Sequence, residues 1–405
     1  MIRGSDFIVQ LIEGTIRSYD WGSRTAIAEL TGRPSPTDHP EAEMWFGAHH
    51  AAPSMVMSED VTLDQFIDAD PERQLGEGYQ SLPFLLKLLA ADKALSLQAH
   101  PSKAQAETGF AAEDAAGVPL TAYERSYKDD NHKPELVVAL TQFDALAGFR
   151  SVEKITEILR VLDLPELQSY AGILGSGDAA ADIRSLFTTW VTLPQSFMDE
   201  LLAVVVPRCE FLLDANSAQL SDWIKPSLET VVTLAEQFPG DSGVLCSLLL
   251  NRLRLQPGDG LYLDAGQLHA YLGGTAVEIM ANSDNVLRSG LTSKHVDVPE
   301  LMKVLTFEQL EDPSLTANEL GIFETPAPDF CLRRMEQGQE TTVTGPAIVL
   351  SVGNGGVVVT SGHGCRETDL ASGGAVWVSN EDQGTRVAVR AEGSLAFIAT
   401  VGGNE

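Results

Sequence analysis

The sequence of 405 residues is poor in cysteine and has no long apolar run. Its cysteines (Cys209, Cys246, Cys331 and Cys365) are widely spaced and form no Cys-x-x-Cys pair. We therefore expect buried thiols in a reducing cytoplasm, not a disulfide framework. The longest apolar stretch, around residues 201–207, is far shorter than the roughly 18–20 residues that span a bilayer. A membrane-spanning protein is excluded.

Basic residues are also scarce, with 27 Lys and Arg against 57 Asp and Glu and a net charge of −30. Nucleic acids and anionic membranes bind basic surfaces, so neither is an expected partner. A phosphate ester as substrate would need a local cluster of Lys and Arg. Charged residues throughout positions 3–20 leave no apolar core for a signal peptide, which favours a cytoplasmic protein. We expect a monomer.

The residue pattern changes along the chain. Residues 1–102 alternate β-rich runs with Gly and Pro turns, and 136–149 is strand-like. A helix and a loop are predicted over 104–131. Between 151 and 238, apolar residues recur every three or four positions, which predicts helices. Further predictions are helices at 153–162, 196–206, 227–237 and 298–310, strand character from 242 to 286, and a small all-β unit at the end.

A strand-like segment, residues 94–101, carries two potential metal ligands. Alternate side chains on a strand face opposite ways, so the apolar odd-numbered positions would pack into the core. Ser96, Gln98 and His100 share the other face. Gln98 and His100 can converge on one ion through an amide oxygen and an imidazole nitrogen. A polar strand face is usually just solvated, so this segment alone does not establish a site.

Residues 258–269 resemble the second cupin motif, with Gly258, Gly266 and His269 in its glycine and histidine positions. Asp264 replaces the usual proline, so the match is partial. The glycines permit a sharp turn that would aim His269 into the mouth of a barrel.

Together these patterns predict a mainly β fold with an α insertion: cupin or jelly-roll barrels in a bicupin-like arrangement, with a helical domain. The expected domains are a catalytic cupin domain (1–150 plus 241–315), a helical insertion (151–240) and a small, metal-free, cupin-like C-terminal β-barrel (316–405).

The segment Asn-His-Lys-Pro-Glu-Leu at 131–136 carries further polar candidates. If it enters a strand, Lys133 and Glu135 share a face and His132 takes the opposite one. Glu135 would then be a carboxylate ligand with the Lys133 cation beside it. An exposed salt bridge is the commoner explanation of a single Lys-x-Glu pair.

Several dissimilar blocks, in the same order, resemble the type I mannose-6-phosphate isomerases of the cupin superfamily. They cover the chain from about residue 19 to 295, whereas the C-terminal part is similar only in being small and β-rich. The blocks are Tyr-Asp-Trp-Gly at 19–22, Glu-x-Trp-x-Gly at 43–47, Ser-Leu-Gln-Ala-His-Pro at 96–101, Asn-His-Lys-Pro-Glu at 131–135, and the run from Ala265 to Lys294.

The resemblance implies an isomerase that interconverts mannose 6-phosphate and fructose 6-phosphate through an enediol. It also implies one zinc ion per chain, whose ligands would be Gln98, His100, Glu135 and His269. Two nitrogen and two oxygen donors suit Zn²⁺.

The reaction also needs groups that transfer protons. The candidates are Glu278, Lys133, His132 and Asp284. Regular strands would let Glu278 and Lys133 share the polar face, but the sequence does not choose among the four. Arg288 is the expected electrostatic stabiliser or anchor, since its forked donors match phosphate oxygens. Expected substrate contacts are Trp21, Lys87, Ser96 and Lys294, the last three completing an anion pocket.

Two other functions remain open: a cupin isomerase or epimerase acting on another sugar phosphate, and a non-enzymatic bicupin that binds sugar or metal. The remaining histidines are weaker candidates. His49 and His50 are adjacent, and adjacent residues on a strand point to opposite faces, so we do not expect a shared metal. His295 and His363 are expected to be structural or exposed.

Overall fold

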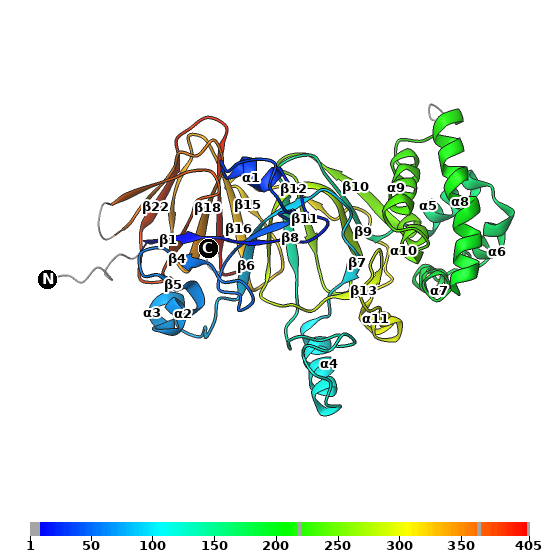
Figure 1. Cartoon of the computed structure of the whole chain (residues 1–405), viewed down its shortest axis with the longest axis horizontal. Helices are drawn as coiled ribbons and strands as arrows, with labels where there is room; N and C mark the ends of the chain where they lie inside the picture. Colours follow the sequence, from blue (N-terminus) through cyan, green and yellow to red (C-terminus); the bar gives the residue numbers. More distant parts are fainter. Residues whose placement is uncertain (1–8, 217–219, 363–365, 403–405) are drawn as a thin grey trace.

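The protein is described by a computed structural model that covers residues 9–216, 220–362 and 366–402. Three regions follow one another along the long axis: the C-terminal strands at one end, a large sheet in the centre and a group of helices at the other end (Figure 1). The sheets are antiparallel. The prediction of a mainly β protein with an α insertion is confirmed.

The central sheet holds the candidate site. Its strand order is an open path, β14-β11-β8-β12-β6-β3-β2. These strands are β2 Thr15–Arg17, β3 Glu43–Phe46, β6 Phe84–Ala91, β8 Glu135–Ala139, β11 Gly260–Leu263, β12 His269–Ala281 and β14 Ser314–Leu315. Four more strands branch from the path: β7 Leu97–Ala99, β9 Phe143–Phe149, β10 Leu250–Leu255 and β13 Leu287–Gly290.

Strand β12 joins the two arms of this sheet. Its first residues pair with β7 and β9, and its later residues pair with β6 and β8. The change of partner falls at Gly274, where φ is +117° and a Cβ would lie 2.5 Å from the carbonyl oxygen of Gln142. Only glycine fits such a bend. One strand can therefore bring side chains from both arms to a common centre.

The C-terminal strands form two further sheets. The larger has the order β15-β16-β23-β18-β21-β1-β4-β5, and the smaller β17-β22-β19-β20. Their bounds are β1 Val9–Glu13, β4 Met55–Val56, β5 Val61–Thr62, β15 Ile322–Phe323, β16 Cys331–Glu336, β17 Glu340–Val343, β18 Ala347–Gly353, β19 Val357–Thr360, β20 Glu367–Leu370, β21 Ala375–Val378, β22 Thr385–Val389 and β23 Ser394–Thr400. Strand β1, early in the chain, therefore pairs with β21 near its end.

The helical region lies between β9 and β10. Its elements are α5 Val152–Leu162, η1 Pro165–Leu167, α6 Gln168–Ala171, α7 Ala179–Val191, α8 Gln195–Asn216, α9 Ile224–Gln237, α10 Ser242–Cys246 and η2 Ser247–Leu249. In α5, buried residues recur at three- and four-residue spacing, and the Ser151 hydroxyl accepts the Lys154 N–H at 3.3 Å as an N-cap. The three helices predicted here are confirmed.

One predicted element is wrong in its first half. Residues 242–249 are helical, and only 250–255 form a strand. The Asp241 carboxylate accepts the N–H groups of Gly243 and Leu291, at 2.7 and 2.8 Å, and so caps the short helix α10. A short buried helix and a buried strand have the same apolar composition, which explains the error.

The remaining helices are α1 Ala26–Leu30, α2 Leu63–Asp68, α3 Pro71–Leu75, α4 Lys103–Ala115 and α11 Val298–Val304. Two of them, α4 and α11, confirm predicted helices, although α11 ends earlier than expected. Cys209 and Cys246 lie in the core of the helical region as buried thiols. Cys365 is outside the described residues. Among the described residues, no helix has the length and apolar character needed to cross a bilayer.

The pairing of β1 with the C-terminal sheet can be tested on two neighbouring side chains. Ile12 is buried at 4% exposure, whereas Leu11 is 46% exposed. We expect Ile12→Ala to lower the free energy of unfolding by about 2–5 kcal/mol, because it leaves a cavity in the core. The control Leu11→Ala should change it by less than about 0.5 kcal/mol. Urea unfolding measures both, and equal effects would contradict the strand pairing.

Candidate functional site

A cavity of about 830 Å³ opens at the central sheet. The site residues predicted from sequence that line it are Trp21, Lys87, Ser96, Gln98, Lys133, Glu135, Glu278, Asp284, Arg288 and Lys294. His100 and His269 lie against Glu135, each almost fully buried. Of the predicted site residues only His132 lies elsewhere.

The sheet register brings four potential ligands together. His269, the first residue of β12, pairs with Gln98 of β7. Glu135 begins β8, and its carboxylate oxygens lie 3.4 Å from His100 Nε2 and 3.5 Å from His269 Nε2. The Gln98 amide is 3.4 Å from His269 Nε2. His100, Glu135 and His269 form a group whose ligand atoms lie within 4.8 Å of one another.

The hydrogen bonds of the two imidazole rings fix their tautomers. His100 Nδ1 lies 2.6 Å from the Asn285 carbonyl oxygen, and His269 Nδ1 lies 3.0 Å from that of Gln267. A carbonyl oxygen only accepts, so each Nδ1 carries the hydrogen and each Nε2 presents a lone pair. Burial lowers the pKa of His100 to about 4, which keeps this ring neutral.

Two acceptors at this centre lack hydrogen-bond partners although they are buried: His100 Nε2 and Glu135 Oε2. Buried polar atoms are nearly always satisfied, so such a pair calls for a missing partner. Converging lone pairs from two imidazoles, a carboxylate and an amide fit a cation with nitrogen and oxygen ligands, such as Zn²⁺. The residues present therefore fit a metal ion.

A tight turn aims His269 at this centre. Gly266 has a φ of +77°, and a Cβ there would lie 2.8 Å from the Val304 carbonyl oxygen. The glycine of the partial cupin motif is thus needed for its backbone conformation and for lack of space.

Alternating charges surround the centre. Lys133 Nζ lies 3.0 Å from Glu135 Oε1. Lys87 Nζ lies 2.8 Å from Glu278 Oε2 and 3.4 Å from Glu43 Oε1. The Tyr271 hydroxyl donates to Glu278 Oε1 at 3.0 Å. Three buried carboxylates therefore share two buried ammonium groups.

The pKa shifts follow from this arrangement. Burial would raise the pKa of Glu135, but the Lys133 ammonium outweighs it and holds this pKa well below the ordinary value. Burial likewise opposes the charge of Lys87, yet the carboxylates around it raise its pKa. Burial raises the pKa of Glu278 against the effect of Lys87. Glu278 thus takes up a proton more readily than Glu135 does.

Cations without carboxylate partners gather at the mouth. Among the described residues, Arg288 and Lys294 form no ion pair, and burial lowers the pKa of both. They also line a second cavity of about 340 Å³ together with Lys128. Lys128 lies in a loop with no periodic pattern, so it was not predicted as a site residue. Glu43 and Tyr271 were not predicted either, although each lies two residues from a predicted or motif residue, Trp45 and His269 respectively.

The structure can be compared with the predictions for the other histidines. The His132 ring lies 2.8 Å from Asp329 and away from the cavity, as strand alternation predicted. His295 packs against the Tyr123 ring, with centroids 5.6 Å apart, and His363 is outside the described residues.

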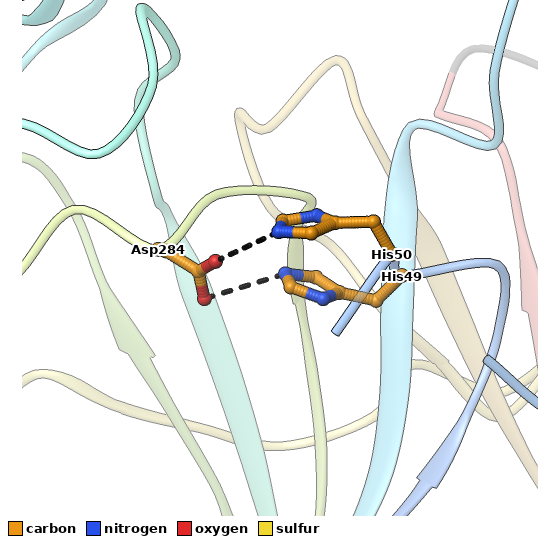
Figure 2. A group of neighbouring side chains, drawn as sticks. All are labelled: His49, His50 and Asp284. Carbon is orange, nitrogen blue, oxygen red and sulfur yellow. Dashed lines mark ion pairs between the residues drawn. The ribbon is translucent and has the colours of Figure 1, made fainter. Parts of the chain in front are cut away.

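The predicted directions of the His49 and His50 side chains were wrong. Their rings stack side by side, with centroids 4.6 Å apart, and both face Asp284 (Figure 2). Strand β3 ends at Phe46, so the two residues lie in a turn where strand alternation does not apply.

Fold and site together define a class: a mainly antiparallel β protein with a candidate metal centre at the foot of a cavity and unpaired cations at its mouth. This is the build of a metal-dependent enzyme with a small anionic substrate.

Comparisons with known proteins specify the class. A family model for the catalytic domain of type I phosphomannose isomerase matches residues 9–152. The mannose-6-phosphate isomerase of Escherichia coli (strain K12) is 37% identical over 96% of this chain and 99% of its own. The apo crystal structure of the Salmonella typhimurium enzyme is 34% identical, with a TM-score of 0.85 over 98% of this chain and all of its own. A zinc-bound holo structure of a mannose 6-phosphate isomerase has the same score and coverage at 32% identity. The chain belongs to the type I phosphomannose isomerase family.

The pairing of buried charges in the site predicts how the free energy of unfolding changes when one charge is removed. Lys87→Met would leave Glu278 and Glu43 buried without their cation, so we expect the free energy of unfolding to fall by about 3–5 kcal/mol at pH 8. Without Lys87 the pKa of folded Glu278 rises further above its unfolded value. The loss should therefore be smaller at pH 5, where the folded protein holds a proton on Glu278.

Urea unfolding at the two pH values checks this. The control is Lys103→Met, since the Lys103 ammonium forms exposed ion pairs with Glu107 and Asp130. It should cost less than about 1 kcal/mol at either pH. A Lys87→Met protein as stable as the control would show that the buried pair is not needed.

Proposed function

We propose that the protein is an isomerase that interconverts D-mannose 6-phosphate and D-fructose 6-phosphate. The observation that carries the proposal is the buried group of His100, Glu135 and His269, with its unpartnered acceptors, at the foot of a cavity whose mouth is cationic. Membership of the type I phosphomannose isomerase family supports the same reaction. An aldose–ketose isomerase must move a proton between C1 and C2 of the open-chain sugar and must hold the phosphate away from the reacting carbons.

The proposed cofactor is one Zn²⁺ per chain, held by Gln98, His100, Glu135 and His269. The lone pairs of the two rings and the carboxylate support this set, and rotation of the Gln98 amide can present its oxygen. When bound, zinc supplies a Lewis acid that polarises an oxygen of the sugar.

Proton transfer is proposed for Glu278, Lys133 and Asp284. Glu278 is buried and lines the cavity, and its raised pKa suits a group that accepts and returns a proton near neutral pH. Lys133, in its ion pair with Glu135, lies next to the proposed metal and can donate to a sugar oxygen. His132 has no part in the proposal, because its ring is bound to Asp329.

Arg288 and Lys294 are proposed as the main anchors for the negative substrate, with Ser96 beside them in the cavity wall. Neither cation is neutralised within the described part of the chain, so both can pair with phosphate. Lys87 lines the same cavity, but its ammonium is occupied by Glu278 and Glu43. Its proposed role is to keep these carboxylates in place beneath the sugar. Trp21 lies in the wall of the cavity, and its proposed role is to contact the apolar face of the sugar.

The domain division is likewise a proposal. A catalytic domain of the cupin type would comprise residues 1–150 plus 241–315, a helical insertion 151–240, and a metal-free cupin-like unit 316–405. The concentration of helices between β9 and β10 supports the middle part. Strands β1, β4 and β5 lie in the first part and extend the sheet of the third. A cytoplasmic location and a monomeric state stay predictions.

A coupled assay tests the function directly. We expect formation of fructose 6-phosphate from mannose 6-phosphate, its loss after chelation, and its recovery with added zinc. His100→Ala should abolish turnover and bind far less than one zinc per chain, measured by elemental analysis. His39→Ala, at an exposed position, is the control and should keep both. Turnover of another hexose phosphate alone would indicate a different isomerase, and a zinc-bound protein inactive on every sugar phosphate would indicate a binding protein.

The role of Arg288 has a separate test. We expect Arg288→Ala to keep its zinc and melting temperature and to lose about 10²–10³-fold in kcat/KM, because a preorganised charged donor is removed. Arg288→Lys should recover part of the rate, since an ammonium lacks the paired donors of a guanidinium. The control Arg390→Ala removes an exposed arginine paired with Glu367. If Arg288→Ala stays within a fewfold of this control, Arg288 does not contact the substrate.

A further inference from the structure

His49 is a buried histidine to which the proposed mechanism assigns no role. Its side chain is 2% exposed, and its ring packs edge-on against Trp45, with centroids 4.9 Å apart. The turn that carries it is closed by backbone hydrogen bonds from Ala52 N–H to the His49 carbonyl and from Ser54 N–H to the Gly47 carbonyl, at 3.0 and 2.9 Å. The position of the imidazole is therefore set by packing and by the backbone.

The hydrogen bonds of His49 fix where its proton lies. The Ala51 backbone N–H donates to His49 Nδ1 at 3.2 Å, so Nδ1 is an acceptor. In the neutral ring the hydrogen must then be on Nε2. That nitrogen lies 3.3 Å from Asp284 Oδ1, and the ring points at the carboxylate (Figure 2). His49 thus donates to Asp284.

The same tautomer argues against a second metal site. His49, His50 and Asp284 have ligand atoms within 4.8 Å of one another, as a metal site would require. A metal on His49 Nε2 would displace the hydrogen to Nδ1. Two N–H donors, Nδ1–H and that of Ala51, would then face each other. A hydrogen-bonded pair fits these contacts and a metal does not.

Asp284 belongs to the wall of the cavity. It lines both the main cavity and the smaller one beside it, next to Arg288 in each. Its backbone N–H donates to Asp129 Oδ2 at 2.7 Å, which anchors the main chain. Its carboxylate faces His49 at 3.3 Å and the exposed His50 at 3.8 Å, so the buried His49 is the nearer and better fixed of the two contacts.

Several charged groups act on the Asp284 carboxylate. His49 and His50 face it from the turn after β3, Lys133 from the start of β8, and Lys128 from the loop before β8. Burial would raise the pKa of Asp284, but the His49 hydrogen bond and the Lys133 charge outweigh it and lower this pKa. His50 is 83% exposed and lies 3.8 Å away, so its contribution is screened by water.

We infer that His49 is a positioning residue of the isomerase, which holds the Asp284 carboxylate toward the substrate by donating its Nε2–H. The inference rests on the proposed function, because it takes Asp284 to contact the sugar phosphate. His49 itself touches no reacting atom. A mispositioned catalytic group can cost about 10²-fold in rate without any change in the groups present.

Three variants separate this role from a structural one. His49→Leu removes the donor, and we expect kcat/KM to fall about 10–100-fold. In this variant the pKa of Asp284 should rise, because its donor is lost, and NMR titration of the Asp284 carboxyl group measures the change. His49→Gln keeps an amide N–H near Nε2 and should restore most of the rate and the original pKa of Asp284. His50→Ala is the matched neighbour and should cost less than about fivefold.

A double-mutant cycle with Asp284→Asn completes the test. If His49 acts through Asp284, His49→Leu should cost less than about twofold in the Asp284→Asn background. Zinc content and melting temperature are measured for each variant. The inference is overturned if His49→Leu leaves the pKa of Asp284 unchanged, if its effect on kcat/KM persists undiminished without Asp284, or if the parent binds a second zinc that is lost in His50→Ala. A parent without isomerase turnover would overturn the proposed function and this inference with it.

Discussion

The buried carboxylate of Glu135 is the group on which the rest of the site depends. An ionised carboxylate in the core is costly unless it is paired and hydrogen-bonded. Lys133 meets one of its oxygens at 3.0 Å, and the Nε2 atoms of His100 and His269 face the carboxylate at 3.4 and 3.5 Å. Each ring donates its Nδ1–H to a backbone carbonyl, so its Nε2 is the atom that faces the carboxylate. The carboxylate and the two rings thus need a cation between them, and the fold is arranged to accept one.

The cations deep in the cavity are paired with carboxylates, whereas those at its mouth are not paired within the described residues. At depth, Lys87 and Lys133 are matched by Glu43, Glu135 and Glu278, so these two ammonium groups cannot also neutralise a phosphate. At the mouth, Arg288 and Lys294 have no ion pair within the described part of the chain. A protein with a net charge of −30 repels anions at long range. The cations at this opening give the described part of the chain a local attraction for an anionic substrate.

Strand alternation explains what could be predicted from the sequence. It placed Gln98 and His100 on one face, Lys133 beside Glu135, and His132 on the opposite side. These directions are found, although His100 directly follows β7 and residues 132–133 lead into β8. It failed in the turn after β3. His49 and His50 lie in a turn, so their directions depend on backbone hydrogen bonds that join residues 47–54. Lys128 reaches the site from a loop. The pairing of β1 with β21, near the other end of the chain, depends on tertiary packing that no local pattern encodes.

The correct and the incorrect predictions of side-chain direction have the same physical origin. Successive side chains on a β-strand point to opposite faces of the sheet. A ligand on a strand can therefore be assigned to a face from its position in the sequence alone. A side chain on a turn has no such period, and its direction follows from the partners that the folded chain supplies. Asp284 shows the consequence. It was predicted as one of four candidates for proton transfer, and what distinguishes it is its contact with His49, from a turn 235 positions earlier. The metal centre is thus built from regular strands, whereas the groups that orient the residues around it come from turns and loops.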